Sequence, residues 1–302
     1  MLMITEDEVR NVLDYPGTID VLRKAFISLG EGNASTAPRI RTFGDRFVLS
    51  TMPSVISSLG VAGAKIYSAT SGKASFRVII FRTSDAEPVA LLEANYLGQI
   101  RTGSLAAMAS SLFVHERNVD MGIIGSGFQA ESNLMAHAAL FNPGTVRVYS
   151  RNHDHAVRFS ARMSGKLGIE VKAEKTPDAV SLNSRIINTV TNARVPILRS
   201  EMMPEKYHLN LVGSNIMGNR EVSQEVMEQS DLVCVEHLDQ AMSESTEIKE
   251  YVESHGHAKM IELKEAVVKS REMPRTVFKS MGNGIEDVAA AWYVLRKMGL
   301  MS

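Results

Sequence analysis

The chain has 302 residues, 44% hydrophobic and 22% charged, so it can bury the cores of about two globular domains. Its formal net charge of −1 at pH 7 argues against a nucleic-acid partner, because such binding needs a basic surface. We expect a cytoplasmic protein with no membrane partner, since no apolar run reaches about 18 residues and the first eight residues carry acids. The single cysteine, Cys234, suits a reducing compartment.

The first part of the chain predicts a mixed α/β region. A helix is expected over residues 19–29, and an Ala-rich helix over 102–113 connects this region to the next. Segments of alternating polarity between the two helices predict an antiparallel sheet. These segments are residues 47–52, 63–67, 77–82 and 88–93.

From residue 119 to about 263 the pattern changes to short β-branched runs alternating with amphipathic stretches, which predicts a parallel sheet with crossover helices. The expected strands are 120–124, 146–150, 169–173, 186–190, 209–212, 232–235 and 260–263. The expected helices are 129–141, 155–167, 177–182, 221–229 and 247–253.

A last helix is expected over residues 285–298, where the acids Glu286 and Asp287 suit the positive end of the helix dipole. We expect this helix to return to the N-terminal region. The predicted organisation is therefore an N-terminal domain over residues 1–112, completed by 285–302, and a Rossmann-type doubly wound domain over residues 113–284.

A glycine loop follows the strand at 120–124. Gly125, Ser126 and Gly127 are followed by Ala130 in a G-x-G-x-x-A pattern that opens a helix. The first glycine suits a tight turn, the second lets backbone amides approach a pyrophosphate, and the alanine allows close packing of helix on strand. Because strand, loop, helix and second strand come in the right order, we interpret the loop as a dinucleotide site.

The end of the second strand favours NADP over NAD. An NAD site usually has a carboxylate there for the ribose 2′-hydroxyl. This chain has Ser150, Arg151 and Asn152, with no acid before Asp154. The Arg151 guanidinium, helped by Ser150, suits a 2′-phosphate. NAD is the alternative, with Arg151 as a solvated turn residue.

Several further short segments, spread over nearly the whole chain, are notable. They are Pro38-Arg39, Met52-Pro53, Lys65, Arg101-Thr102-Gly103, the loop from Gly125 to Ala130, Thr191 to Pro196, Val212-Gly213-Ser214, Arg220-Glu221 and Gly284 to Ala289.

With these segments the chain resembles the ornithine cyclodeaminase and mu-crystallin family. The resemblance implies a Rossmann domain and an N-terminal α/β domain that binds substrate and pairs in a homodimer. It also implies hydride exchange at the α-carbon of an amino acid or its imine.

The resemblance further implies that Arg39, Lys65 and Arg101 grip the substrate carboxylate, with Lys65 and Arg101 as the catalytic residues. Fixed cations offset the desolvation of a carboxylate in a partly dry cleft. Arg41 is an alternative to Arg39, and salt bridges are the alternative role for Lys65 and Arg101. Lys65 is notable in itself, because it interrupts a small and apolar run where an unpaired ammonium would be costly. If desolvated, it could also donate or accept a proton.

Two more sets of site residues follow from the resemblance. The cofactor set is Thr102, Gly125, Ser126, Gly127, Phe128, Gln129, Ser150, Arg151, Thr191, Val212 and Gly213. Asn215 is expected at the substrate, in the position where cyclodeaminases carry a catalytic aspartate. An amide cannot take a proton from an α-ammonium group.

The family's second acid, before the Met-Pro pair, is also missing, because Ser50 and Thr51 stand there. We therefore expect an NAD(P)H-dependent reductase of cyclic or linear imines, or an alanine dehydrogenase-like enzyme. The alternatives are a cyclodeaminase with bound NAD and a non-catalytic carrier of NADPH and a small ligand. No metal site is expected, since the His255 and His257 pair lacks a nearby third ligand.

Overall fold

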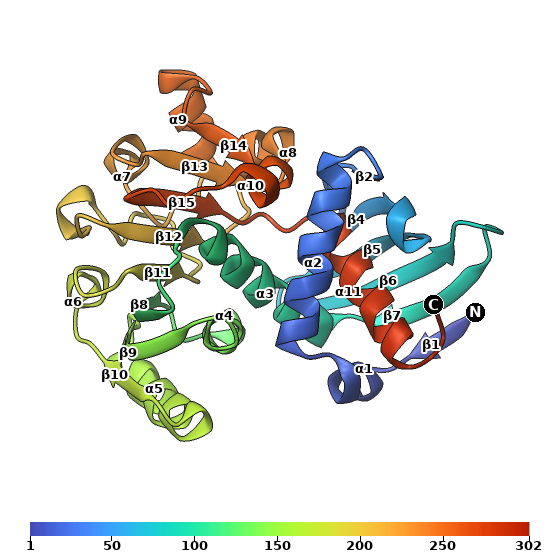
Figure 1. Cartoon of the computed structure of the whole chain (residues 1–302), viewed down its shortest axis with the longest axis horizontal. Helices are drawn as coiled ribbons and strands as arrows, with labels where there is room; N and C mark the ends of the chain where they lie inside the picture. Colours follow the sequence, from blue (N-terminus) through green and yellow to red (C-terminus); the bar gives the residue numbers. More distant parts are fainter. Residues whose placement is uncertain (302) are drawn as a thin grey trace. The chain divides into compact units, whose positions relative to one another are not determined.

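The computed structural model describes residues 1–301, and the chain divides into two compact units. Unit 1 comprises Met1–Leu105 and Gly282–Ser302, and unit 2 comprises Ala106–Met281. The boundary between them lies within helix α3 (Asn95–Phe113). In Figure 1, unit 1 runs from blue to cyan and includes the red helix α11, and most of unit 2 runs from green to orange.

Unit 1 is built on a seven-stranded sheet in the order β1-β7-β6-β5-β4-β2, with β3 also paired to β4. All pairs are antiparallel except β1 with β7. The four segments predicted to form an antiparallel sheet are β4 to β7 and do pair in that way, whereas β1, β2 and β3 were not predicted. The strands are β1 (Leu2–Ile4), β2 (Ala34–Thr36), β3 (Ile40–Gly44), β4 (Phe47–Ile56), β5 (Val61–Thr70), β6 (Lys73–Arg82) and β7 (Pro88–Glu93).

Helix α11 (Gly284–Lys297) packs against β4, β5 and β6 and against α2 (Tyr15–Gly30), which confirms that the last helix returns to the N-terminal region. A side chain on Gly284 would come within 2.5 Å of the Met52 carbonyl oxygen, so only glycine fits where α11 begins against β4. The remaining helices of unit 1 are α1 (Glu6–Val12) and the short 3-10 helix η1 (Ser57–Leu59).

Unit 2 contains an eight-stranded parallel sheet in the order β10-β9-β8-β11-β12-β15-β13-β14, so the Rossmann-type fold class is confirmed. Its central strands are buried on both faces, as parallel strands covered by helices require. The eight strands of this sheet are β8 (Asn118–Ile124), β9 (Asn142–Tyr149), β10 (Glu170–Ala173), β11 (Ile186–Thr189), β12 (Tyr207–Leu211), β13 (Leu232–Val235), β14 (Met260–Glu262) and β15 (Arg275–Lys279).

The sequence predicts all of these strands except β15. That strand contains only two adjacent apolar residues, Val277 and Phe278, between Thr276 and Lys279, so it lacks the apolar run of a buried strand. Lys279 is nevertheless fully buried. The helices of unit 2 are α4 (Phe128–Ala138), α5 (His153–Leu167), α6 (Pro177–Ser181), α7 (Gln224–Glu228), α8 (Leu238–Glu244), α9 (Thr246–His255), α10 (Leu263–Lys269) and the 3-10 helix η2 (Ser200–Met202). Of these, α8 and α10 were not predicted.

The strand order reverses between β8 and β11, because the chain runs outward from β8 through β9 to β10 and then returns to β11. In open parallel sheets, ligands bind beyond the carboxyl ends of the strands at such a switch point. Among residues 1–301, no helix is both long and apolar enough to cross a membrane.

Candidate active site

The glycine loop lies at the switch point of unit 2. Gly125 follows β8 and has φ of 113°, and an added Cβ would meet the Val190 carbonyl oxygen at 2.8 Å. Glycine is therefore required there both for the backbone conformation and for the close approach. Gly127 is the N-cap of α4, and no side chain in the described part of the chain caps that helix start. The positive end of α4 is thus suited to an anion.

A cleft of about 1120 Å³ lies over this loop. It brings together ten of the eleven residues predicted to bind the cofactor, from the ends of β8, β9, β11 and β12. These are Gly125, Ser126, Gly127, Phe128, Gln129, Ser150, Arg151, Thr191, Val212 and Gly213.

Thr102 is the residue of the predicted cofactor set that does not line the cleft. It belongs to unit 1, and its hydroxyl donates to the Gly98 carbonyl one turn earlier in α3, at 2.8 Å. Sequence reasoning missed His155, Asn192 and Arg194, which do line the cleft. Asn192 and Arg194 could have been found from their position, because they lie in the loop after β11, a strand that borders the switch point.

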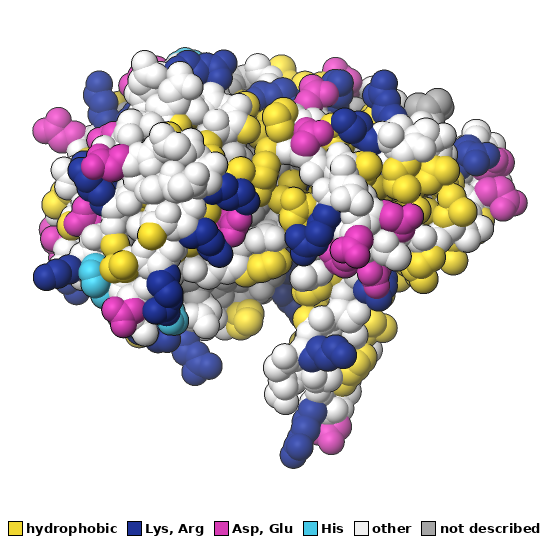
Figure 2. Space-filling model, turned by 90° about the horizontal axis from the view of Figure 1, so that it is seen from below, with side chains coloured by type: hydrophobic (Ala, Val, Ile, Leu, Met, Phe, Trp, Pro, Cys, Tyr) yellow, Lys and Arg dark blue, Asp and Glu magenta, His cyan; other side chains and the backbone are white. Residues whose placement is uncertain are grey.

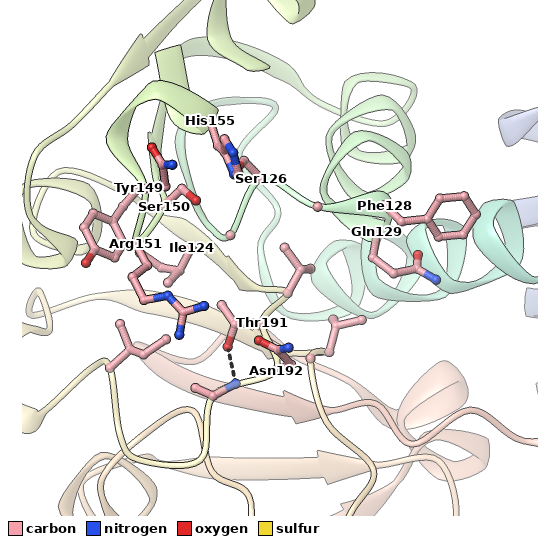
Figure 3. A pocket seen from close by; sticks show the side chains of 18 of the residues that line it. Ile124, Ser126, Phe128, Gln129, Tyr149, Ser150, Arg151, His155, Thr191 and Asn192 are labelled. Carbon is pink, nitrogen blue, oxygen red and sulfur yellow. Dashed lines mark hydrogen bonds between the residues drawn. The ribbon is translucent and has the colours of Figure 1, made fainter. Parts of the chain in front are cut away.

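The end of the cleft beside β9 is polar and basic. Arg151 and Asn152 follow β9, and Asn152 caps α5 by accepting from the Asp154 amide at 3.0 Å. Figure 3 shows Ser150, Arg151 and His155 among the side chains around this cleft. Of the described residues that line the cleft, none is an aspartate or a glutamate, and two are arginines.

The second group of predicted site residues lies in unit 1 and is buried. Lys65 on β5 and Arg101 on α3 are 5% and 6% exposed. Both donate to the same oxygen, Oδ1 of Asp287 on α11: the Lys65 Nζ and the Arg101 Nε each lie 3.1 Å from it. Arg101 also donates through Nη1 to Glu286 Oε2 at 2.5 Å. We call Lys65, Arg101, Glu286 and Asp287 the charged cluster.

Arg39 lies close to this cluster within unit 1. Its guanidinium donates to the Met52 Sδ at 3.4 Å and to the Gly282 carbonyl at 3.1 Å. Met52 pairs with Lys65 across β4 and β5, so these contacts bring Arg39 toward the same end of the sheet. The three predicted cations thus gather within unit 1.

Burial lowers the pKa of Lys65 to about 8. The Asp287 carboxylate opposes this effect because it favours the ammonium form, whereas the positive charges of Arg101 and Arg39 lower the pKa of Lys65 further. Lys65 can therefore exchange a proton near neutral pH, which an ordinary lysine does not readily do.

The acids of the charged cluster are the partners that sequence reasoning missed. Glu286 and Asp287 were assigned only to the helix dipole, but both are fully buried. The Oδ2 atom of Asp287 makes no hydrogen bond within the described residues, although it is buried. The available signal was that these two acids come directly before the apolar run Val288–Trp292, where charged side chains are rarely buried without partners.

Asn215 lies in unit 2, in the loop after β12, and is partly exposed. It does not line the cleft. The preceding carbonyl, that of Ser214, accepts a hydrogen bond from the buried Lys279 Nζ at 2.9 Å, which fixes this part of the loop.

The parallel sheet and its glycine loop define a Rossmann-type dinucleotide-binding protein. The chain belongs to the ornithine cyclodeaminase/mu-crystallin family, whose model matches residues 1–299.

Two relatives illustrate the range of the family. The chain is 27% identical to a Δ1-pyrroline-2-carboxylate reductase of Bacillus cereus over 317 residues, which cover 98% of this chain and 96% of the relative. It is 29% identical to the ketimine reductase mu-crystallin of Mus musculus over 217 residues, or 71% and 66% of the two chains.

One solved structure is similar over its whole length. It is Thermococcus litoralis Δ1-pyrroline-2-carboxylate reductase in complex with NADH and L-proline, which is 27% identical, has a TM-score of 0.91, and is matched over 100% of this chain and 99% of that one.

Proposed function

We propose that this chain is an NAD(P)H-dependent oxidoreductase that reduces an imine of a 2-oxo acid, cyclic or linear, to the amino acid, or catalyses the reverse oxidation. The observation that carries the proposal is the pairing, in one chain, of a glycine-loop cleft with a buried lysine of lowered pKa beside two arginines. The names of the reductase relatives agree with it.

In this reaction the imine carbon receives a hydride and the imine nitrogen receives a proton. The bound nicotinamide supplies the hydride. Arg39 and Arg101 hold the substrate carboxylate, because guanidinium groups suit its two oxygens. Lys65 delivers the proton in its ammonium form, and its pKa of about 8 makes that transfer easier than an ordinary lysine would.

The proposed cofactor is NADPH in preference to NADH. The cleft carries Arg151 and His155 near the end of β9 and a second arginine, Arg194, in the loop after β11. A 2′-phosphate carries negative charge and suits such a lining, whereas the ribose of NADH usually meets a carboxylate, which this lining lacks.

Unit 1 is the proposed substrate and dimerisation domain, and the protein is proposed to be a homodimer in the cytoplasm. The face of β4 and β5 turned away from α11 exposes Leu49, Val55 and Ile66, and β3 adds Phe43. Figure 2 shows hydrophobic side chains gathered at the surface on the side where the strands of unit 1 lie. Exposed apolar patches of this kind mark interfaces.

The test is a spectrophotometric screen of the purified protein for oxidation of NADPH and NADH. The substrates are pyruvate with ammonia, pyrroline-2-carboxylate and piperideine-2-carboxylate, and ammonia release from ornithine and lysine is followed in parallel. We expect cofactor consumption in proportion to an imine. Ammonia release without net cofactor change would support the cyclodeaminase instead, and tight NADPH binding without any turnover would support a carrier.

A further inference from the structure

We propose that Glu221 is a positioning residue that fixes the wall of the cleft where the nicotinamide half of the cofactor binds. This inference rests on the proposed function only in requiring that a dinucleotide occupies the cleft. In a doubly wound sheet the adenosine lies toward the second strand, here β9, so the nicotinamide half lies toward β11 and β12.

The Glu221 carboxylate links the loops that follow these two strands. Its Oε1 accepts from the Thr191 amide at 2.8 Å and the Thr191 hydroxyl at 2.7 Å. Its Oε2 accepts from the Gly213 amide and the Thr189 hydroxyl, both at 2.8 Å. Thr191 and Gly213 line the cleft, whereas Glu221 lies behind them and is fully buried.

The two loops are held too close together for a side chain between them. A Cβ on Gly213 would lie 2.0 Å from the Thr191 carbonyl oxygen and 2.2 Å from Glu221 Oε1. The constraint also extends along the β11 loop, because the Thr191 hydroxyl accepts from the Ala193 amide at 3.2 Å, the dashed bond in Figure 3. A displacement of the carboxylate would therefore move both loops.

Other groups of unit 2 hold the backbone of Glu221 in place. Its own amide donates to Glu247 Oε1 at 2.9 Å, and its carbonyl accepts from the Ile197 amide at 2.8 Å. Lys279 Nζ lies 3.9 Å from Glu247 Oε2 and balances part of the buried negative charge. These contacts within unit 2 fix the position from which the carboxylate reaches the two loops.

Only a carboxylate satisfies this arrangement. Each of its oxygens accepts one backbone amide, that of Thr191 or that of Gly213. In a Glu221→Gln variant one oxygen becomes an NH2 group, and whichever way the amide turns, that group faces a backbone N–H that cannot accept. The unmade hydrogen bond is buried and costly, so the two loops should separate.

The experiment compares the dissociation constants of a whole dinucleotide, NADPH or NADH, with those of adenosine fragments, 2′,5′-ADP or ADP, which lack the nicotinamide. For Glu221→Gln we expect the dinucleotide to bind about 10- to 100-fold more weakly, as loss of a buried charged hydrogen bond implies. We expect the fragments to bind as they do to the unaltered chain. The matched control is Glu244→Gln, a buried acid of α8 that does not line the cleft, which should change neither affinity.

Two outcomes would overturn the inference: unchanged dinucleotide binding, or equal weakening of dinucleotide and fragment, which marks a general structural role. If Glu221→Gln does not fold, Thr189→Val and Thr189→Ser replace it, because Thr189 is buried and does not line the cleft. Valine removes the hydroxyl that donates to Oε2 and should weaken the dinucleotide selectively, whereas serine keeps this hydroxyl and should not. Equal affinities for both variants would count against the inference. Failure of the unaltered chain to bind either dinucleotide would instead refute the proposed function.

Discussion

The nucleotide cleft of unit 2 and the charged cluster of unit 1 are built in opposite ways. The cleft is formed by loops at strand ends, with glycines, backbone amides and partly exposed side chains. The cluster consists of four charged side chains that are almost completely buried and that neutralise one another. Replacing an exposed side chain of the cleft leaves its backbone amides in place, whereas removing one member of a buried charged set leaves another charge unpaired.

The largest effect is therefore expected in unit 1. Lys65→Ala and Arg101→Ala should each lower turnover of an imine substrate by about 10²-fold or more, since a placed acid or a carboxylate clamp is lost. Because the cleft belongs to unit 2, NADPH affinity should stay unchanged. Turnover assays paired with cofactor titration check this. Lys73→Ala, an exposed lysine on the neighbouring strand β6, is the control, and near-parental turnover of Lys65→Ala would show that this lysine is structural.

A smaller and more specific effect is expected for Asp287→Asn. The Asp287 charge supports the ammonium form of Lys65, so its removal lowers the pKa of Lys65 below about 8. The proton-donating form is lost as pH rises through that pKa, so the alkaline limb of the kcat profile should move to lower pH.

The pH profile separates this role of Asp287 from a purely structural one. A variant that is merely less stable loses active protein at all pH values without moving the limb. Asp20→Asn, which removes an exposed carboxylate paired with Lys24, should leave the profile in place. An unshifted alkaline limb in Asp287→Asn would mean that Lys65 is not the titrating donor.

In the cleft we expect an effect of about tenfold, or 1.4 kcal/mol, on cofactor choice. Arg151→Asp should weaken NADPH by at least that factor, because a carboxylate repels the 2′-phosphate, and it should spare or improve NADH. Dissociation constants of both cofactors measure this. The control is Arg158→Asp, an exposed change on helix α5, which follows Arg151 in the chain; Arg158 lies outside the cleft. Equal affinities of the unaltered chain for the two cofactors would remove the basis of the prediction.

The same contrast explains which features could be predicted from the sequence. The glycine loop and Arg151 lie within about thirty residues, and their meaning depends on local order of strand, turn and helix. Lys65 and Asp287 are 222 residues apart, and no spacing rule connects them. Only the return of α11 onto β4, β5 and β6 makes them partners.

Strand β15 could not be predicted either, because its place in the sheet is set by tertiary structure. The chain reaches it last in the sheet, yet it lies between β12 and β13. The flanking strands bury its polar and charged residues Thr276 and Lys279, whose sequence pattern alone argues against a buried strand. Glu221 is similar, because its role depends on two loops that meet only once β11 and β12 are paired.

The smallest effect is expected at Asn215, the position where the family resemblance predicts an aspartate in cyclodeaminases. The unaltered chain should release no ammonia from ornithine, because an amide cannot take the proton of an α-ammonium group. Asn215→Asp restores a base, but a base contributes its usual 10²–10⁴-fold only when it is well placed. The hydrogen bond from Lys279 to the Ser214 carbonyl holds the loop in place, so the loop cannot readily move to bring a carboxylate at position 215 to the substrate. We therefore expect amino acid oxidation to rise by less than about tenfold, with Asn219→Asp in the same loop as the control. Stoichiometric proline and ammonia from ornithine, formed by the unaltered chain without net cofactor change, would show that another group serves as the base.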